Sequence, residues 1–286
     1  MEFLTLLYGT VLLRPYVFIF LAFYLALAVL NMGAVRSIVF TVLAYAIAFL
    51  SEYSSTRNGF PYGFYSYIET TRGQELWVSN VPFMDSLSYT FLSYVSYTLS
   101  LLLHSPLKTN GWDVRIVETG PVKSSLRTVL TGAALFMLLD VIIDPVAFHG
   151  DRWFLGKIYT YKEEGEYFHI PLTNFAGWFL VGTAILYCFS RANVWLESLP
   201  GFRDAGPRDF PGKGLFGPGI YFGVLAFNLG VTFYIGEILL GICGTAISLS
   251  ILAVVLYKIR NPKAFAGNPH APLARGKGKF RDLDYR

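Results

Sequence analysis

The run from Gly217 to Tyr257, GPGIYFGVLAFNLGVTFYIGEILLGICGTAISLSILAVVLY, carries a single charged residue, Glu237. A helix that crosses the hydrocarbon core of a bilayer needs about 20 predominantly apolar residues. The run is therefore long enough for two spans, and we expect the turn between them at Gly236. It predicts adjacent transmembrane helices, roughly Pro218 to Gly236 and Glu237 to Tyr257.

Five more stretches of similar length and apolarity precede this run. They are Tyr16 to Met32, Ser37 to Tyr53, Met84 to Leu103, Ser125 to Ile143 and Leu172 to Ser190. The composition agrees, because 54% of the residues are hydrophobic and only 15% are charged, whereas soluble domains carry about 25% charge. The sequence predicts an all-α polytopic membrane bundle of about seven transmembrane helices, with residues 1–260 as one domain. The first thirteen residues are apolar but end at Arg14-Pro15, which indicates an interfacial or frayed helix instead of an eighth span.

Basic residues are distributed unevenly between the two sides of this bundle. Of the 23 Lys and Arg residues, 17 fall on one side, which includes the C-terminal tail. Because cytoplasmic loops carry an excess of Lys and Arg, the N-terminus is expected outside and the C-terminus in the cytoplasm of an inner or plasma membrane. The net charge of +4 mostly reflects this bias, and no nucleic-acid partner is predicted. Residues 261–286 are rich in Gly, Pro and basic residues and predict a disordered cytoplasmic tail.

If the seven stretches cross the membrane in this orientation, the acidic side chains in or beside them all lie near its outer face. A charged group at membrane depth costs roughly 2.5–3.5 kcal/mol on insertion scales and is interpreted first as functional. Six residues meet this description: Glu52, Asp85, Asp140, Asp144, Glu166 and Glu237.

Asp140 and Asp144 lie four positions apart and therefore share one helix face. Mutual repulsion and loss of hydration both favour a carboxyl that keeps its proton, and a protonated acid beside an ionised one is suited to general acid–base catalysis. We take Asp140, Asp144 and Glu52 as candidate catalytic acids, with Asn174 to orient water or a carboxyl.

The alternative is a structural role for these acids. In that interpretation they cap helices or pair with Arg57 and Arg152 at the interface. Asp85 and Glu237 would then be first-turn acids favoured by the helix dipole, and Glu166 would be solvated.

The outer loops, residues 54–82 and 145–170, contain many aromatic residues together with Gly and Pro. We expect them to fold over the helix ends as a lid, where ring faces stabilise a cationic intermediate. His149 and His169 flank the second loop, but no metal-ligand spacing supports a site, so no metal is predicted. The candidate substrate-binding residues are Arg57, Tyr62, Tyr65, Tyr67, Asp85, Trp153, Tyr167, His169 and Trp178.

Two segments carry a family resemblance. The first runs from Glu52 through RNGFPYGFYSY (57–67), and the second from Asp140 and Asp144-Pro145 through YFHIPLTNFAGW (167–178). Together they resemble the membrane carotenoid hydratases, which include bacterial γ-carotene hydratases and archaeal bisanhydrobacterioruberin hydratases. The resemblance implies a hydro-lyase without cofactors that adds water to the terminal double bond of an acyclic carotenoid end group. The acids that match are Glu52, Asp140 and Asp144.

The expected partners are membrane lipid and a hydrophobic polyene or isoprenoid substrate, and the oligomeric state is left open. Three other interpretations remain at this stage. One is a proton-coupled transporter of a small molecule or lipid, since intramembrane acids also form proton relays. The second is an enzyme of the same fold that acts on another lipid, with or without a metal held by the acids. The third, a retinal-type receptor, needs a lysine in the middle of a span, and Lys258 lies at the end of one.

Overall fold

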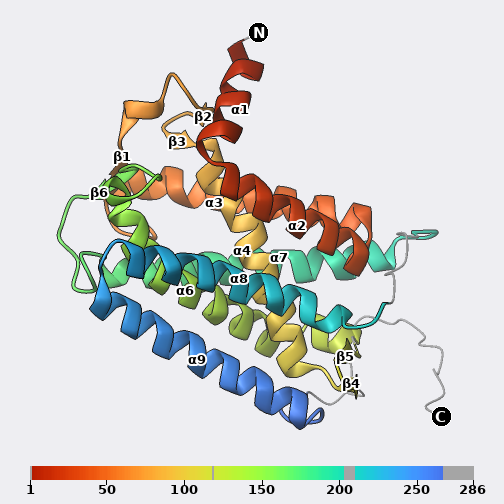
Figure 1. The fold of residues 1–286 in the computed structure, drawn as a ribbon. Helices are drawn as coiled ribbons and strands as arrows, with labels where there is room; N and C mark the ends of the chain where they lie inside the picture. The colour runs from red at the N-terminus through yellow and green to blue at the C-terminus, as the bar shows by residue number, and fades with distance from the viewer. Residues whose placement is uncertain (1, 118, 203–209, 267–286) are drawn as a thin grey trace.

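The computed structural model describes residues 2–117, 119–202 and 210–266, and within them the chain is mostly helical (Figure 1). The α-helices are α1 (Glu2–Leu13), α2 (Pro15–Met32), α3 (Ala34–Asn58), α4 (Phe83–His104), α5 (Gly120–Lys123), α6 (Leu126–Phe148), α7 (Leu172–Ser198), α8 (Lys213–Tyr234) and α9 (Ile238–Arg260). The strands are β1 (Tyr65–Tyr67), β2 (Trp77–Val78), β3 (Val81–Pro82), β4 (Leu107–Asn110), β5 (Asp113–Ile116) and β6 (Tyr159–Tyr161). They form three antiparallel pairs, β1 with β6, β2 with β3 and β4 with β5.

Six helices in the described residues are long and apolar enough to cross a membrane, namely α2, α3, α6, α7, α8 and α9. The chain is an all-α polytopic membrane bundle, as its sequence predicts. The remaining expected span, Met84 to Leu103, corresponds to α4, which has 22 residues. The number of seven spans and their orientation stay predictions.

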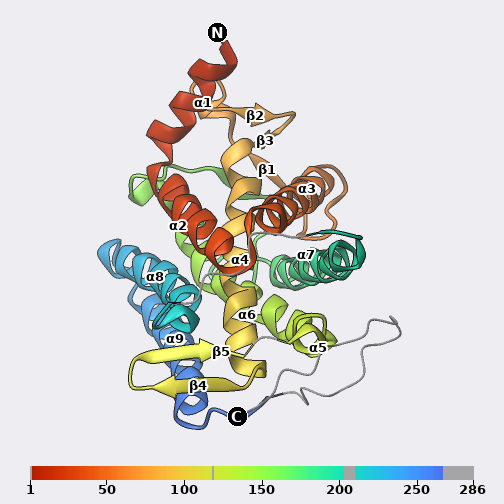
Figure 2. The same ribbon diagram turned by 90° about the vertical axis from the view of Figure 1, so that its right-hand side faces the viewer.

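Helix α4 is more polar than the others because protein surrounds it. It runs through the middle of the bundle with α2, α8 and α9 on one side and α3 and α7 on the other (Figure 2). Almost all of its side chains are buried, including Ser86, Ser93, Ser96 and Ser100. Their hydroxyls donate to carbonyls of the preceding turn, as Ser93 does to Tyr89 at 2.6 Å and Ser96 to Leu92 at 2.8 Å. The hydroxyls of Ser93 and Ser96 are thereby satisfied within the helix.

The turn expected at Gly236 is confirmed. Helix α8 ends at Tyr234 and α9 begins at Ile238. Gly236 has a φ of 80°, a conformation in which a side chain would clash with the backbone. Glu237 is the residue that precedes α9, and its side chain pairs with Arg152.

Helix α6 extends five residues past Ile143, its expected end, and passes through Pro145 to Phe148. Side chains that follow in sequence satisfy the carbonyls of this last turn. The His149 ring lies 2.8 Å from the Pro145 carbonyl, and the Trp153 indole donates to the Val146 carbonyl at 3.1 Å. The loop expected over 145–170 therefore starts only after residue 148. The loop expected over 54–82 likewise starts only after Asn58, because α3 continues to a left-handed cap at Gly59.

The two ends of the bundle differ in character. The loops 59–82 and 149–171 lie at one end, called here the loop end, where Pro82 and Pro171 precede α4 and α7. The opposite, basic end holds the junction of α2 and α3, the hairpin β4–β5 and the start of α8 (Figure 1). The hairpin turns at Gly111, whose φ is 58°. Of the tail expected to be disordered, residues 267–286 lie outside the described part of the chain.

Candidate active site

Asn174 joins Asp140 and Asp144 at the loop end. It lies in the first turn of α7, and its amide nitrogen donates to Asp140 Oδ2 at 2.7 Å and to Asp144 Oδ2 at 3.0 Å. The two aspartates face the same way because they are one helical turn apart in α6. Asp140 is 1% exposed, Asp144 9% and Asn174 3%. One amide group thus holds two buried carboxyls at the same point.

Asp144 receives two further hydrogen bonds from tyrosines of β6. The Tyr159 hydroxyl donates to Asp144 Oδ1, and the Tyr161 hydroxyl donates to Asp144 Oδ2 at 3.0 Å. With Asn174, three donors converge on this one carboxyl, whereas Asn174 is the donor that reaches Asp140. Donors to a carboxylate favour its charged form. The arrangement makes the two aspartates chemically unequal, as an acid and base pair requires.

The tyrosines stand on the two-stranded sheet that joins the outer loops. Tyr65 pairs with Tyr161 and Tyr67 with Tyr159 across β1 and β6. Side chains at alternate positions of a strand point to one face, so both tyrosines of each strand face the carboxyls. Burial raises the pKa of all four phenols well above the ordinary value, and the nearby carboxylates Glu52, Asp85 and Asp144 add to this effect. They therefore remain protonated donors at neutral pH.

Glu52 occupies a separate position behind the aspartate pair. It lies in the last turns of α3 and is 2% exposed. Its carboxyl accepts hydrogen bonds from the Ser86 hydroxyl and, at 3.2 Å, from the Tyr67 hydroxyl. Ser86 follows Asp85 in the first turn of α4. Glu52 thus lies beside the first turn of α4, which also carries Asp85.

A cavity of about 120 Å³ opens beside the aspartate pair. Asp85, Asp140 and Asp144 line it, and aromatic side chains of α2, α4, β6, α7 and α8, together with Trp153, form part of the remaining wall. The Tyr16 and Phe227 rings stack with centroids 6.0 Å apart, and Phe20 lies 6.3 Å from Phe227. The wall of the cavity thus contains both acidic oxygens and electron-rich rings.

Trp153 and Trp178 from the predicted set also line this cavity. Trp178 stacks on Tyr89 with ring centroids 4.5 Å apart, and the Trp153 ring lies 6.3 Å from Phe227. Asp85 enters from the first turn of α4. These three residues are therefore placed together with the aspartate pair.

The other predicted binding residues lie outside the cavity. Tyr62 is buried and shares a hydrogen bond of 2.8 Å with the Ser51 hydroxyl. Arg57 lies over the Tyr53 ring and donates to Asn80 at 2.7 Å, so it pairs with none of the candidate acids. The exposed His169 contacts Glu164 at 2.8 Å, and the Tyr167 ring packs on Phe175 at 5.5 Å. Arg57 and His169 are thus exposed, whereas Tyr62 is buried away from the cavity lining.

Two of the six acids flagged in the sequence also lie outside the group. Glu166 is exposed and accepts a hydrogen bond of 3.3 Å from the Leu172 backbone, and Glu237 pairs with Arg152 at the start of α9. A further buried acid was not among the six. Glu75 is fully buried and pairs with Arg14 at 3.2 Å.

Sequence reasoning missed several residues of the site. Tyr159 and Tyr161 belong to the aromatic residues of the second outer loop and are not among the predicted site residues. The triplets Tyr65-Ser66-Tyr67 and Tyr159-Thr160-Tyr161 nevertheless share a Tyr-x-Tyr pattern, which predicts strands with both rings on one face. The wall residues Tyr16, Phe20, Phe227 and Asn228 lie in helices recognised by hydropathy alone. No periodic signal distinguishes such residues from those that face lipid.

His149 and His169 are two histidines of the loop end, where the aspartates also lie. The two imidazole rings lie 6.1 Å apart. Within residues 2–117, 119–202 and 210–266, no three His, Cys, Asp or Glu side chains are grouped closely enough to hold a metal ion. His149 instead contacts the Pro145 carbonyl.

Fold and site together define an integral membrane protein with paired carboxyls beside an aromatic cavity. A family model described as carotenoid biosynthesis protein matches residues 13–247, and the chain belongs to that family. No curated protein and no solved structure matches it. Membership supports a role in carotenoid biosynthesis and favours an enzyme of that pathway. The match confirms that the chain belongs to a carotenoid biosynthesis family, as the two outer segments indicate.

Proposed function

We propose that the protein is a hydratase that adds water to the terminal double bond of an acyclic carotenoid or isoprenoid end group within the cell membrane. The observation that carries this proposal is the bridge of Asn174 between Asp140 and Asp144 at the wall of the cavity. Hydration of an alkene needs a proton donor, a stabilised cation and a positioned water. Each requirement has a candidate group in this site.

Asp140 is the proposed proton donor. The π electrons of the double bond take its proton at the less substituted carbon, and a tertiary cation forms at the other carbon. Asp140 lines the cavity, whereas Glu52 is not among the residues that line it. This placement favours Asp140 over Glu52, which was an equal candidate on sequence alone.

The aromatic wall is the proposed stabiliser of the cation. Ring faces attract positive charge through their quadrupole, and the effect reaches about 2 kcal/mol or more when the ring is desolvated. Tyr16, Phe20 and Phe227 contribute rings from α2 and α8, and Trp153 and Trp178 complete the wall. An apolar wall also excludes bulk water, so that one positioned water molecule captures the cation.

Asp144 and Asn174 are the proposed water-positioning groups. Asp144 accepts a proton as the water oxygen bonds to the cation, and this proton then returns to Asp140 across the pair that Asn174 holds. The balance is one water consumed and one C–H and one C–O bond formed, with the carboxyls restored. No oxidant or reductant is required.

The cavity of about 120 Å³ is sized for an end group and not for a whole polyene. Tyr16, Phe20 and Phe227 are each half-buried, and all three line the cavity. We infer that the polyene chain enters sideways from the lipid between α2 and α8. Water would come from the loop end, where the carboxyls lie.

The test is expression of the full chain in a lycopene-producing host, followed by pigment mass analysis. The expected result is a mass gain of one water for each hydrated end group. A host whose pigments stay unchanged while the protein accumulates in the membrane would contradict carotenoid hydration. In that case uptake driven by a pH gradient in proteoliposomes separates the transporter from an enzyme that acts on another lipid.

A further inference from the structure

A second and larger cavity lies at the basic end of the bundle. Its volume is about 490 Å³, within the range of about 300–1,000 Å³ typical of ligand pockets. It is lined by the end of α2, the start of α3, the second half of α4, the hairpin β4–β5, α5, α7 and the start of α8. Asp85 and the lining residue Thr98 are 13 positions apart on α4, which corresponds to about 20 Å along the helix. The cavity is therefore distinct from the carboxylate site.

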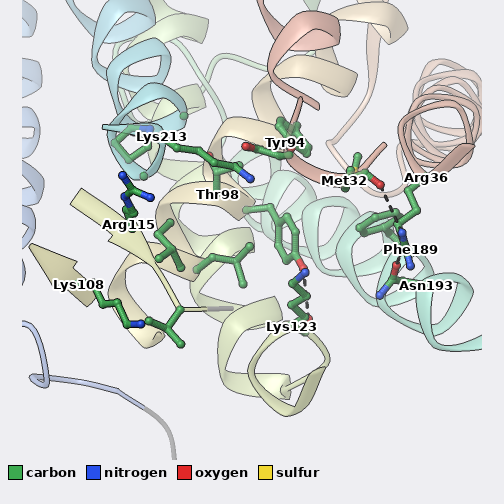
Figure 3. Close-up of a pocket in the computed structure, with 18 residues that line it drawn as sticks. Met32, Arg36, Tyr94, Thr98, Lys108, Arg115, Lys123, Phe189, Asn193 and Lys213 are labelled. Carbon is green, nitrogen blue, oxygen red and sulfur yellow. Dashed lines mark hydrogen bonds between the residues drawn. The ribbon is translucent and has the colours of Figure 1, made fainter. Parts of the chain in front are cut away.

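Five cationic side chains surround this cavity, and no Asp or Glu is among the lining residues that the structure describes (Figure 3). Two acids stand just outside the lining. Asp113 accepts from Arg115 at 2.8 Å, and Glu197 contacts Arg36 at 3.4 Å. The five cationic residues are Arg36, Lys108, Arg115, Lys123 and Lys213.

The backbone adds to this positive character. Helix α8 begins at Lys213 without a side-chain cap, and its first-turn residue Gly214 lines the cavity. The N-terminus of a helix carries the positive end of the helix dipole. At this one the N–H groups of Gly212, Lys213 and Leu215 already donate to Asp113, Phe210 and Gly212. A Cβ at Gly214 would lie 2.7 Å from the Val114 carbonyl, so glycine allows β5 and α8 to meet here. Arginine, lysine and a helix N-terminus are together the groups that bind phosphate.

A buried acceptor completes the site. Asn31 lines the cavity, and its Oδ1 is buried and accepts no hydrogen bond in the described structure, while its amide nitrogen donates to the Tyr94 hydroxyl at 3.2 Å. An unpaired buried acceptor costs roughly 1–3 kcal/mol and is satisfied by a donor from a ligand. The oxygens of a phosphate diester are acceptors only, whereas an alcohol hydroxyl offers the donor that Asn31 lacks.

We propose that this basic-end cavity binds a phosphate ester of a polyol, with the phosphate on the cationic side chains and a hydroxyl donating to Asn31. Met32, Leu101 and Phe189 add apolar surface to the same wall. Basic pockets between transmembrane helices on the cytoplasmic side bind anionic lipid head groups. A phosphoglycerol lipid head group and a soluble glycerol phosphate share the chemistry that the cavity recognises.

The experiment measures binding to the purified full chain in nanodiscs by thermal shift and native mass spectrometry. Four conditions are compared: phosphatidylcholine nanodiscs alone, with phosphatidylglycerol, with soluble glycerol 3-phosphate and with inorganic phosphate. Stabilisation by phosphatidylglycerol alone identifies a lipid head group, and stabilisation by glycerol 3-phosphate identifies a soluble source. Either result supports the site. Equal binding of inorganic phosphate and glycerol 3-phosphate would overturn the role of the polyol.

Variants locate the binding. Lys108→Gln with Lys213→Gln should weaken binding by about tenfold or more, because each cation near an anionic head group contributes about 1 kcal/mol. The matched control is Lys157→Gln with Lys162→Gln at the loop end, which should bind as the unmodified chain does. Asn31→Leu should reduce the preference for phosphatidylglycerol over phosphatidic acid. Unchanged binding in the Lys108 and Lys213 variant would overturn the proposal.

Discussion

The Asn174 amide nitrogen lies 2.7 Å from Asp140 Oδ2, although 34 positions separate the two residues in the sequence. The same nitrogen reaches Asp144, so a neutral amide stands between two carboxyls that would otherwise repel. An amide has two N–H donors and can serve both acids at once. This bridge lets the protein hold two buried acids side by side, and the first two predictions concern it.

Asp140→Asn should abolish hydration in the lycopene-producing host while the protein still folds. The change removes the proposed proton donor but keeps the size of the side chain, and a general acid contributes about 10²- to 10⁴-fold to a rate. Asp113→Asn at the basic end is the control and should retain activity. Glu52→Gln should also retain most of it if Asp140 is the donor. Full activity of the Asp140→Asn variant would refute the assignment.

Asn174→Leu should impair both folding and catalysis. It leaves two buried carboxyls without their shared donor, and each buried group that loses its partner costs about 1–3 kcal/mol. We expect a lower unfolding temperature in detergent and little or no hydrated pigment. Asn174→Gln, which keeps the amide, should recover part of the stability. A Leu variant as stable as the unmodified chain would show that the bridge has no structural role.

Alkaline pH should destabilise the protein through the four tyrosines of β1 and β6. Burial raises the pKa of these phenols above the ordinary value of 10 in the folded state. Above pH 10 the unfolded chain loses these protons and the folded chain keeps them, so the free energy of unfolding falls as pH rises. The stability that the tyrosines confer is complete below pH 10.

The measurement is thermal unfolding between pH 8 and 11, with tyrosinate absorbance recorded in parallel. Tyr67→Phe with Tyr161→Phe should flatten the alkaline decline, and Tyr234→Phe, at an exposed position, should leave it unchanged. Ionisation of the four phenols well before unfolding would contradict this account.

The ion pair of Arg14 and Glu75 should be a strong determinant of stability at the loop end. The side chains are 4% and 0% exposed, and they join the start of α2 to the loop after β1. Loss of one partner leaves a buried charge without compensation, which costs about 3–5 kcal/mol. Arg14→Met and Glu75→Gln should each lower the unfolding temperature, and the double variant should recover part of the loss. Additive losses in this cycle would argue against direct pairing.

The aromatic wall should affect the rate more than it affects stability. Trp153→Leu removes one ring from the cavity, and loss of a desolvated cation–π contact of about 2 kcal/mol slows the reaction by about thirtyfold. Trp153→Phe keeps a ring face and should recover much of the rate. The measurement is pigment conversion normalised to the amount of protein in the membrane. Equal rates for the Leu and Phe variants would remove this ring from the mechanism.

The sequence by itself determined the helical class, the seven apolar stretches and the turn at Gly236, because spanning a bilayer requires long apolar helices and glycine tolerates a positive φ. It also determined that Asp140 and Asp144 share a face, since a helix repeats every 3.6 residues. Only the tertiary structure decided which distant groups meet them. Asn174, Tyr159 and Tyr161 reach the aspartates because α7 packs on α6 and β6 pairs with β1. Hydropathy does not predict such contacts, because a ring that lines a cavity and a ring that faces lipid are equally apolar.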